Sequence, residues 1–167
     1  MDIVSHALVG RALVTSQDKR FDRYLVSFFG ALPDVFQIPL YMFVGRLHDR
    51  PFYFPQTSDW TGVRAAYPGW SLWWDIPHSL FFLLLVVTPA VLLLKLNKLA
   101  IAAYALHLFL DLFTHTGEWG LMPFFPFSYK FSGFTDAWAW DYPYFVISWA
   151  VLIACILLLE KYRVRVK

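Results

Sequence analysis

The residues best suited to chemistry are two histidines and an aspartate at four-residue intervals inside an apolar stretch. They are His107, Asp111 and His115, within Leu99–Thr116. On a helix, four residues advance the chain by about 6 Å and rotate it by about 40°, so the three side chains share one stripe. Ionisable groups in hydrocarbon are costly unless they are paired or bound to something. An imidazole–carboxylate–imidazole stripe in such surroundings therefore predicts a metal site.

The spacing of this stripe favours more than one metal ion. The backbones of His107 and His115 are about 12 Å apart along a helix, whereas a metal–nitrogen bond is only about 2 Å long. Asp111 lies between the two histidines and is placed to bridge two ions. Nitrogen-rich ligands favour zinc, with manganese or iron as alternatives. We expect two or more zinc ions, and the water that such a centre activates suits the hydrolysis of phosphoesters.

Three further polar residues lie at the ends or breaks of other apolar segments. Asp34 lies about 15 Å into one segment, and Pro33 before it predicts a broken helix at Pro33-Asp34 because proline cannot donate a backbone hydrogen bond. His78 opens another segment, and His6 lies on a short apolar stretch at the N-terminus. We expect all of these groups to converge with the stripe at one depth. The structural alternatives are a helix cap at Asp34 and a headgroup contact at His78.

Composition indicates an integral membrane protein. The chain has 167 residues, of which 59% are hydrophobic and 16% charged, against about 25% charged in a soluble domain. Its apolar residues fall in blocks that approach the roughly 17–25 residues needed to span a bilayer. We expect one domain, residues 1–167: an all-α polytopic membrane helical bundle with four to five hydrophobic segments, the fifth being residues 1–14 if they span. The four clear blocks are Tyr24–Val44, Ser79–Leu94, Leu99–Phe113 and Tyr144–Leu159.

Basic residues predict the orientation of the chain in the membrane. They concentrate in Arg11–Arg23, in Lys95–Lys98 and at the C-terminus, which ends at Lys167. These stretches alternate with two long loops rich in aromatic residues, 46–75 and 117–141. By the positive-inside rule the basic stretches and the C-terminus are cytoplasmic, and the loops and the site face the exoplasmic side. The aromatic residues form either an interfacial belt or a lid over an amphiphilic substrate, and no basic face for nucleic acid is evident.

The order of these motifs resembles the membrane-bound metal-dependent hydrolases of prokaryotes, over most of the chain. The resemblance rests on Met1–Gly10 with Ser5-His6-Ala7, Gly30–Asp34, His78-Ser79-Leu80, and His107-x3-Asp111-x2-Thr114 followed by a Gly and the pair Pro123-Phe124. That family is similar to the zinc-dependent phospholipases C and single-strand nucleases, which are all-helical. The resemblance implies location in the prokaryotic inner membrane. It also implies the metal ligands His6, Asp34, His78, His107 and Asp111, with Asp111 bridging and His115 as a further ligand.

The chain departs from that family at one place. Family members have a His-Arg pair a few residues before His78, where this chain reads Trp73-Trp74-Asp75-Ile76-Pro77. Either Asp75 or His115 would then replace the histidine, or the centre would hold fewer ions.

The expected function is hydrolysis of a lipid or polyprenyl phosphate, with water activated by metal and oriented by Asp34 or Asp111. The bilayer and an amphiphilic phosphoester are the expected partners. Two alternatives stay open. Intramembrane acids and histidines also serve as a relay in proton or ion transporters, and a bound metal could instead staple a non-catalytic membrane scaffold.

Overall fold

The structure, a computed structural model, describes residues 2–165, and the regular secondary structure in this range is helical. No β-strand occurs within it, and only one isolated antiparallel bridge joins Leu121 to Phe131. The prediction of an all-α fold is therefore confirmed. Met1, which opens the first motif, and Lys167, in the basic C-terminal stretch, lie outside the described residues. The helices are α1 (Ile3–Ala12), α2 (Arg20–Phe36), α3 (Ile38–Leu47), η1 (Pro51–Tyr53), η2 (Thr57–Trp60), α4 (Val63–Ala66), α5 (Pro68–Asp75), α6 (Leu80–Phe82), the π-helical η3 (Leu83–Val87), α7 (Thr88–Leu93), α8 (Leu99–Thr114), η4 (Gly117–Trp119), η5 (Ala137–Ala139) and α9 (Tyr142–Arg165).

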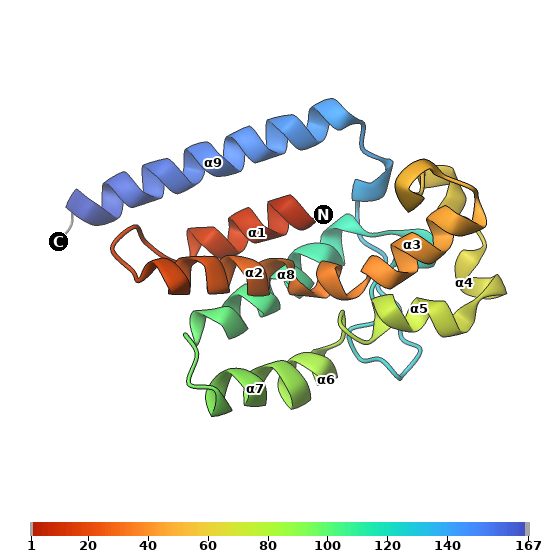
Figure 1. The fold of residues 1–167 in the computed structure, drawn as a ribbon, viewed down its shortest axis with the longest axis horizontal. Helices are drawn as coiled ribbons and strands as arrows, with labels where there is room; N and C mark the ends of the chain where they lie inside the picture. Colours follow the sequence, from red (N-terminus) through yellow and green to blue (C-terminus); the bar gives the residue numbers. More distant parts are fainter. Residues whose placement is uncertain (1, 166–167) are drawn as a thin grey trace.

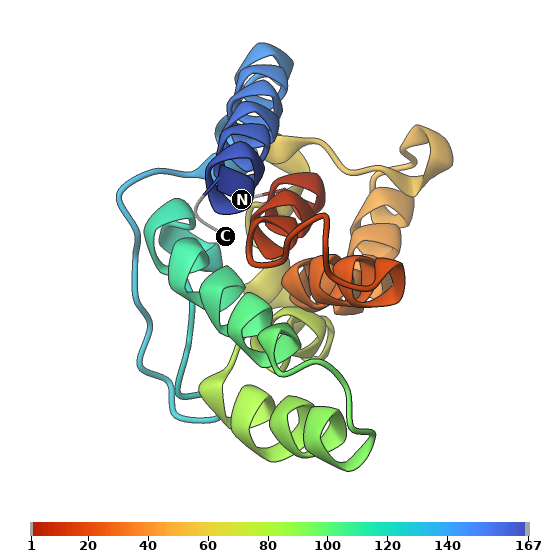
Figure 2. The same ribbon diagram turned by 90° about the vertical axis from the view of Figure 1, so that its left-hand side faces the viewer.

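The short helix α1 lies at the centre of the arrangement, in contact with α2, α8 and α9 (Figures 1 and 2). It begins at Asp2, whose carboxylate accepts hydrogen bonds from the backbone N–H groups of Val4 and Ser5, as expected for an N-cap residue. The same carboxylate accepts a hydrogen bond from the indole N–H of Trp149 in α9. One residue therefore both starts α1 and holds α9 against it.

Two glycines allow α1 and α2 to approach each other closely. A Cβ atom on Gly30 of α2 would lie 2.6 Å from the backbone oxygen of His6, and one on Gly10 of α1 would lie 2.7 Å from the backbone oxygen of Val26. No side chain larger than hydrogen fits at these distances without moving a helix. Small residues permit such close helix contacts in membrane proteins, and here the contact sets the position of His6.

The helix break predicted at Pro33-Asp34 lies elsewhere. Helix α2 continues through Pro33 to Phe36, and the chain turns at Gln37 before α3 begins. The proline at the interruption is instead Pro39, in the first turn of α3. Proline fits a first helical turn, where its missing N–H would have no partner, and it prevents α2 from running on uninterrupted. Pro33 is accommodated within the helix.

Two parts of the chain are long and apolar enough to cross a membrane. One is the 28-residue stretch of α2 and α3, Arg20–Leu47, and the other is Tyr142–Arg163 of α9. A third exists if α5 and the helices of Leu80–Leu93, bent by 54° at the break between them, form one span. Helix α8 has 16 residues, a length of about 24 Å against a hydrocarbon core of about 30 Å. The structure thus has two candidate spans, and a larger number stays a prediction.

The basic stretches and the long loops lie at opposite ends of the molecule. The turn between α1 and α2, the turn between α7 and α8 and the end of α9 lie together, while the two long loops lie at the other end (Figure 1). At the basic end, Arg11 of α1 pairs with Glu160 of α9. This separation is the one that alternating topology requires.

The glycine contact gives a testable prediction about the fold. Gly30→Ala places a methyl group against the backbone of His6, so we expect it to destabilise the protein by about 1–3 kcal/mol, as overpacking does, and to displace His6. Gly69→Ala in α5 is the control because a Cβ atom there has nothing within 4 Å. Thermal unfolding in detergent measures both variants. Equal unfolding temperatures would contradict a tight α1–α2 contact.

Candidate metal centre

Two histidines at the centre are oriented by backbone carbonyl groups. Nδ1 of His78 lies 2.8 Å from the carbonyl oxygen of Trp74, and Nδ1 of His107 lies 2.7 Å from that of Gly30. A carbonyl oxygen only accepts hydrogen bonds, so both Nδ1 atoms carry hydrogen and, in the neutral rings, both Nε2 atoms present lone pairs. Metal-ligating histidines are held by such outer hydrogen bonds.

The Nε2 atoms of these histidines face each other and two carboxylates. They are 3.3 Å apart, and Nε2 of His107 lies 3.1 Å from Oδ2 of Asp111. Oδ1 of Asp34 lies 3.8 Å from both Nε2 atoms. Ligand atoms about 2.0–2.1 Å from a tetrahedral zinc ion are about 3.3 Å from one another. The four residues Asp34, His78, His107 and Asp111 therefore could hold a metal ion at distances close to those that coordination requires.

A second pair of histidines lies at the other oxygen of Asp111. Nε2 of His6 is 2.9 Å from Oδ1 of Asp111, and Nε2 of His115 is 3.4 Å from the same oxygen. The ring of His6 also stacks on that of His107, with centroids 3.6 Å apart. One carboxylate thus separates two groups of ligand atoms, His78, His107 and Asp34 at Oδ2 and His6 and His115 at Oδ1.

The end of α8 explains how His115 reaches this position. The helix stops at Thr114, and His115 has extended backbone angles, φ −129° and ψ 131°. His107 and Asp111 lie on one face of α8 as the helical spacing predicted. His115 lies one residue beyond the helix, where its Nε2 still lies 3.4 Å from Oδ1 of Asp111, so the prediction of a continuous helical stripe was wrong for this residue.

Burial makes this arrangement costly without a cation. All six side chains are at most 4% exposed. In such surroundings the lone pairs of His78 and His107 repel each other and the carboxylates unless a proton or a cation lies among them, and buried charge without compensation is expensive. Their identities and distances fit a divalent cation.

Gln37, at the turn between α2 and α3, forms a hydrogen bond with the carboxylate of Asp34. Its side-chain Nε2 donates a hydrogen bond of 2.8 Å to Oδ1 of Asp34. Both residues are buried, and the other oxygen of each, Oδ2 of Asp34 and Oε1 of Gln37, has no hydrogen-bond partner among the described residues. These two oxygens are available to a ligand or to water.

The structure brings together every residue that the sequence singled out as a ligand. The suggested substitute for the missing histidine lies apart from them. The six that meet are His6, Asp34, His78, His107, Asp111 and His115. Asp75, considered as a replacement for the missing histidine, instead pairs with Arg64. Because the carboxylate of Asp75 is paired with Arg64, His115 is the residue that adds a histidine to the cluster.

Sequence reasoning missed two residues that shape the site. Gln37 gave no signal beyond its position three residues after Asp34, which places both on one side of a helical turn. Trp74 is one of the loop aromatics expected to form an interfacial belt or a lid, yet it is fully buried and stacks on His78 with ring centroids 3.8 Å apart. Its spacing of four residues from His78 was the available signal.

Comparisons with protein-family models, curated proteins and solved structures give no match for this chain. Its function is therefore inferred from the geometry of the cluster.

Metal binding is tested most directly at His107. His107→Ala removes a ligand that lies close to both His78 and Asp111, so we expect the purified protein to lose bound transition metal. His48→Ala is the matched control, because His48 is exposed and lies 3.8 Å from Asp59, away from the cluster. Elemental analysis after gentle purification measures both. Equal metal content in the two variants would contradict the site.

Gln37 provides a second, independent test. Gln37→Leu removes the hydrogen bond that orients Asp34, and loss of such an outer contact lowers metal affinity by about 10–100-fold. The control is Thr88→Val, which also replaces a buried polar group by an apolar one, on the separate helix α7. Competition with a chelator measures the affinities. Unchanged affinity in Gln37→Leu would show that Asp34 does not depend on this contact.

Proposed function

We propose that the protein is an integral membrane phosphoester hydrolase whose centre holds two divalent cations, with zinc favoured. The observation that carries the proposal is the position of Asp111, with one carboxylate oxygen toward His78 and His107 and the other toward His6 and His115. A carboxylate between two sets of nitrogen ligands suits a bridging role between two ions.

The charge of the loaded centre favours a phosphate substrate. Asp34 and Asp111 contribute two negative charges and the neutral histidines none, so two divalent cations would leave a net charge of about +2 in a buried site. Such a site attracts a phosphoryl anion. When bound, paired cations supply an activated water near neutral pH and neutralise charge at phosphorus.

The chain's own residues complete the reaction. Water oxygen forms the new bond to phosphorus, the bond from phosphorus to the ester oxygen breaks, and the leaving alkoxide takes up the proton that Asp34 accepts from the water. Oδ2 of Asp34, which borders an open cavity and has no hydrogen-bond partner among the described residues, accepts a proton from the attacking water. The carbonyl groups of Trp74 and Gly30 orient the rings of His78 and His107 so that their Nε2 atoms are directed at the centre.

The membrane setting favours a lipid or polyprenyl phosphate over a nucleic acid. The two candidate spans, with the basic ends of the helices gathered opposite the long loops, support insertion with those loops and the site on the exoplasmic side (Figure 1). We place the C-terminus in the cytoplasm and the protein in the prokaryotic inner membrane, as the family resemblance suggests. A polyanionic polymer would reach a site among spanning helices less easily than a lipid would.

Ion counting and turnover test this proposal together. We expect about two transition-metal ions per chain, about one in His6→Ala, and none in Asp111→Ala, since Asp111 serves both groups. Hydrolysis of p-nitrophenyl phosphate by the reconstituted protein should be abolished in Asp111→Ala and retained in Asp49→Asn, an exposed loop carboxylate.

Other results would assign the cluster differently. Bound metal that raises the unfolding temperature, with no product from any phosphoester, would indicate a metal-stapled scaffold. Ion or proton flux in sealed vesicles without turnover would indicate a transporter.

A further inference from the structure

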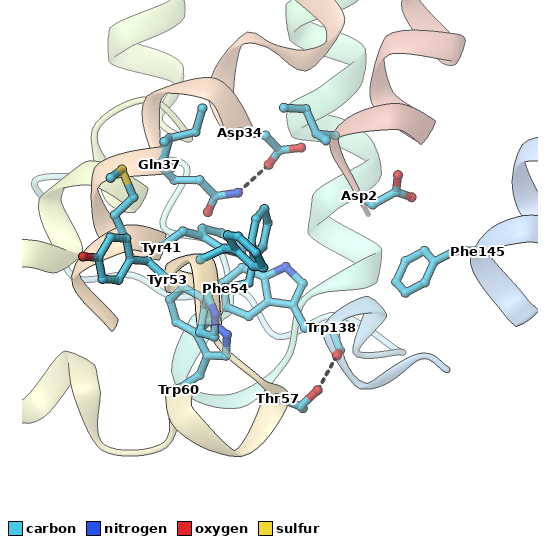
Figure 3. A pocket seen from close by; sticks show the side chains of 15 residues that line it. Asp2, Asp34, Gln37, Tyr41, Tyr53, Phe54, Thr57, Trp60, Trp138 and Phe145 are labelled. Atoms are coloured by element: carbon cyan, nitrogen blue, oxygen red, sulfur yellow. Dashed lines mark hydrogen bonds between the residues drawn. The ribbon is translucent and has the colours of Figure 1, made fainter. Parts of the chain in front are cut away.

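A cavity of about 600 Å³ borders the candidate metal centre. It lies between α3, residues 52–60 and the first turns of α9, and Asp34 of the centre forms part of its wall (Figure 3). Its volume falls within the range of about 300–1,000 Å³ that is typical of sites for one small molecule. A ligand in the cavity would therefore contact the centre directly.

The cavity has a polar side and an apolar side. The carboxylates of Asp34 and Asp2 and the amide of Gln37 lie along one side in Figure 3. Two of the polar atoms there, Oδ2 of Asp34 and Oε1 of Gln37, are buried without a hydrogen-bond partner among the described residues. Both atoms are hydrogen-bond acceptors, so they indicate a place where a cation or a water molecule is expected.

Aromatic side chains from distant parts of the sequence form the rest of the wall. Tyr41 of α3 packs edge-on against Trp60 with ring centroids 4.7 Å apart, and Trp60 lies 4.7 Å from Trp138. Phe145, from α9, faces the cavity across from them (Figure 3). This mainly apolar surface suits a hydrocarbon chain.

The rim of the cavity is also apolar. Ile38 and Met42 of α3 and Ile3 of α1 line it and are themselves exposed. The first two belong to the candidate span Arg20–Leu47, and Phe145 belongs to the candidate span of α9, only 6% of whose hydrophobic window is buried. An opening between α3 and α9 would therefore face lipid.

An aromatic strap, residues Phe52–Pro55, closes one wall of the cavity. Phe52 and Tyr53 have left-handed backbone angles, with φ 54° and 59°, and Tyr53 lies so close to α3 that a Cβ atom on Gly45 would be 2.0 Å from its carbonyl oxygen. Arg50, just before the strap, donates two hydrogen bonds of 2.7 and 2.6 Å to Asp59, just after it, and so joins the two ends of this segment.

The ion pair behind the strap persists at neutral pH. Hydrogen bonding from Arg50 lowers the pKa of Asp59 to about 2, so its carboxylate stays charged well below neutral pH. The exposed rings of Phe52 and Phe54 line the cavity at this wall.

We propose that this cavity binds the single apolar chain of an amphiphilic phosphate monoester, which enters from the bilayer between α3 and α9 and places its phosphate beside Asp34 and Gln37. This inference rests on the proposed function, because the phosphate requires the charge of the loaded centre. One chain fits a cavity of this size, whereas the second chain of a diacyl lipid would have to lie outside it. Gln37 acts as a positioning residue, because its side-chain N–H holds the Asp34 carboxylate that lies beside the phosphate.

Chain selectivity tests the inference in metal-loaded protein reconstituted in nanodiscs. We expect kcat/KM to be higher for dodecyl phosphate and farnesyl phosphate than for p-nitrophenyl phosphate and for dioleoyl phosphatidate. Ile38→Trp and Met42→Trp fill the cavity and should lower the ratio of dodecyl phosphate to p-nitrophenyl phosphate turnover by about tenfold, equivalent to about 1.4 kcal/mol. Ile147→Trp, an exposed position on α9 away from the cavity lining, is the matched control and should leave the ratio unchanged.

Photolabelling provides a readout that does not need turnover. Dodecylphosphonate with a diazirine at the chain end should label peptides that contain Tyr41–Met42 or Phe52–Trp60, and Ile38→Trp should reduce this labelling relative to Ile147→Trp. Labelling confined to the lipid-facing surfaces of α7 and α9 would overturn the inference, as would phosphatidate turnover equal to that of dodecyl phosphate.

The two proposals fail in different ways. Turnover of p-nitrophenyl phosphate without chain preference or cavity labelling leaves the hydrolase and removes the chain site. Cavity labelling that requires bound metal, without turnover of any phosphate, keeps the chain site and removes the hydrolase.

Discussion

The structure depends on a set of buried hydrogen-bond acceptors that face one another. The Nδ1–H groups of His78 and His107 are used by backbone carbonyls, so their lone pairs meet across 3.3 Å beside the carboxylates of Asp34 and Asp111. A low-dielectric interior makes such a cluster unfavourable on its own. A cation converts the same geometry into a favourable one, because every atom that repelled its neighbour becomes a ligand.

The packing of the helices determines the positions of these groups. Gly10 and Gly30 bring α1 against α2, which carries His6 to the centre and leaves the Gly30 carbonyl within reach of His107. The turn at Gln37 lets the chain present both Asp34 to the candidate metal centre and an aromatic wall to the adjoining cavity. Metal centre and cavity thus meet at a single turn between two helices of one candidate span.

The candidate metal centre is polar, and the cavity beside it is mainly apolar. The centre concentrates negative charge that one divalent cation would neutralise, and the cavity next to it is walled by aromatic rings and lined by aliphatic side chains. An amphiphile has the same division along its length. Complementarity of this kind, a few placed polar groups within a mainly apolar pocket, is how small-molecule sites achieve orientation.

The sequence by itself determined that the chain is helical, that it holds segments apolar enough for a membrane, and that His107 and Asp111 share a helix face, because hydrophobic blocks and a four-residue spacing are local properties. Only the tertiary structure decided that His6, Asp34 and His78 join them, that His115 reaches Asp111 from beyond the helix end, and that Asp75 is taken by Arg64. It also moved the helix break from Pro33 to the turn before Pro39. These outcomes depend on which helices pack together and on which carboxylate each loop cation pairs with. Such contacts join residues as far apart as His6 and Asp111, and no local pattern specifies them.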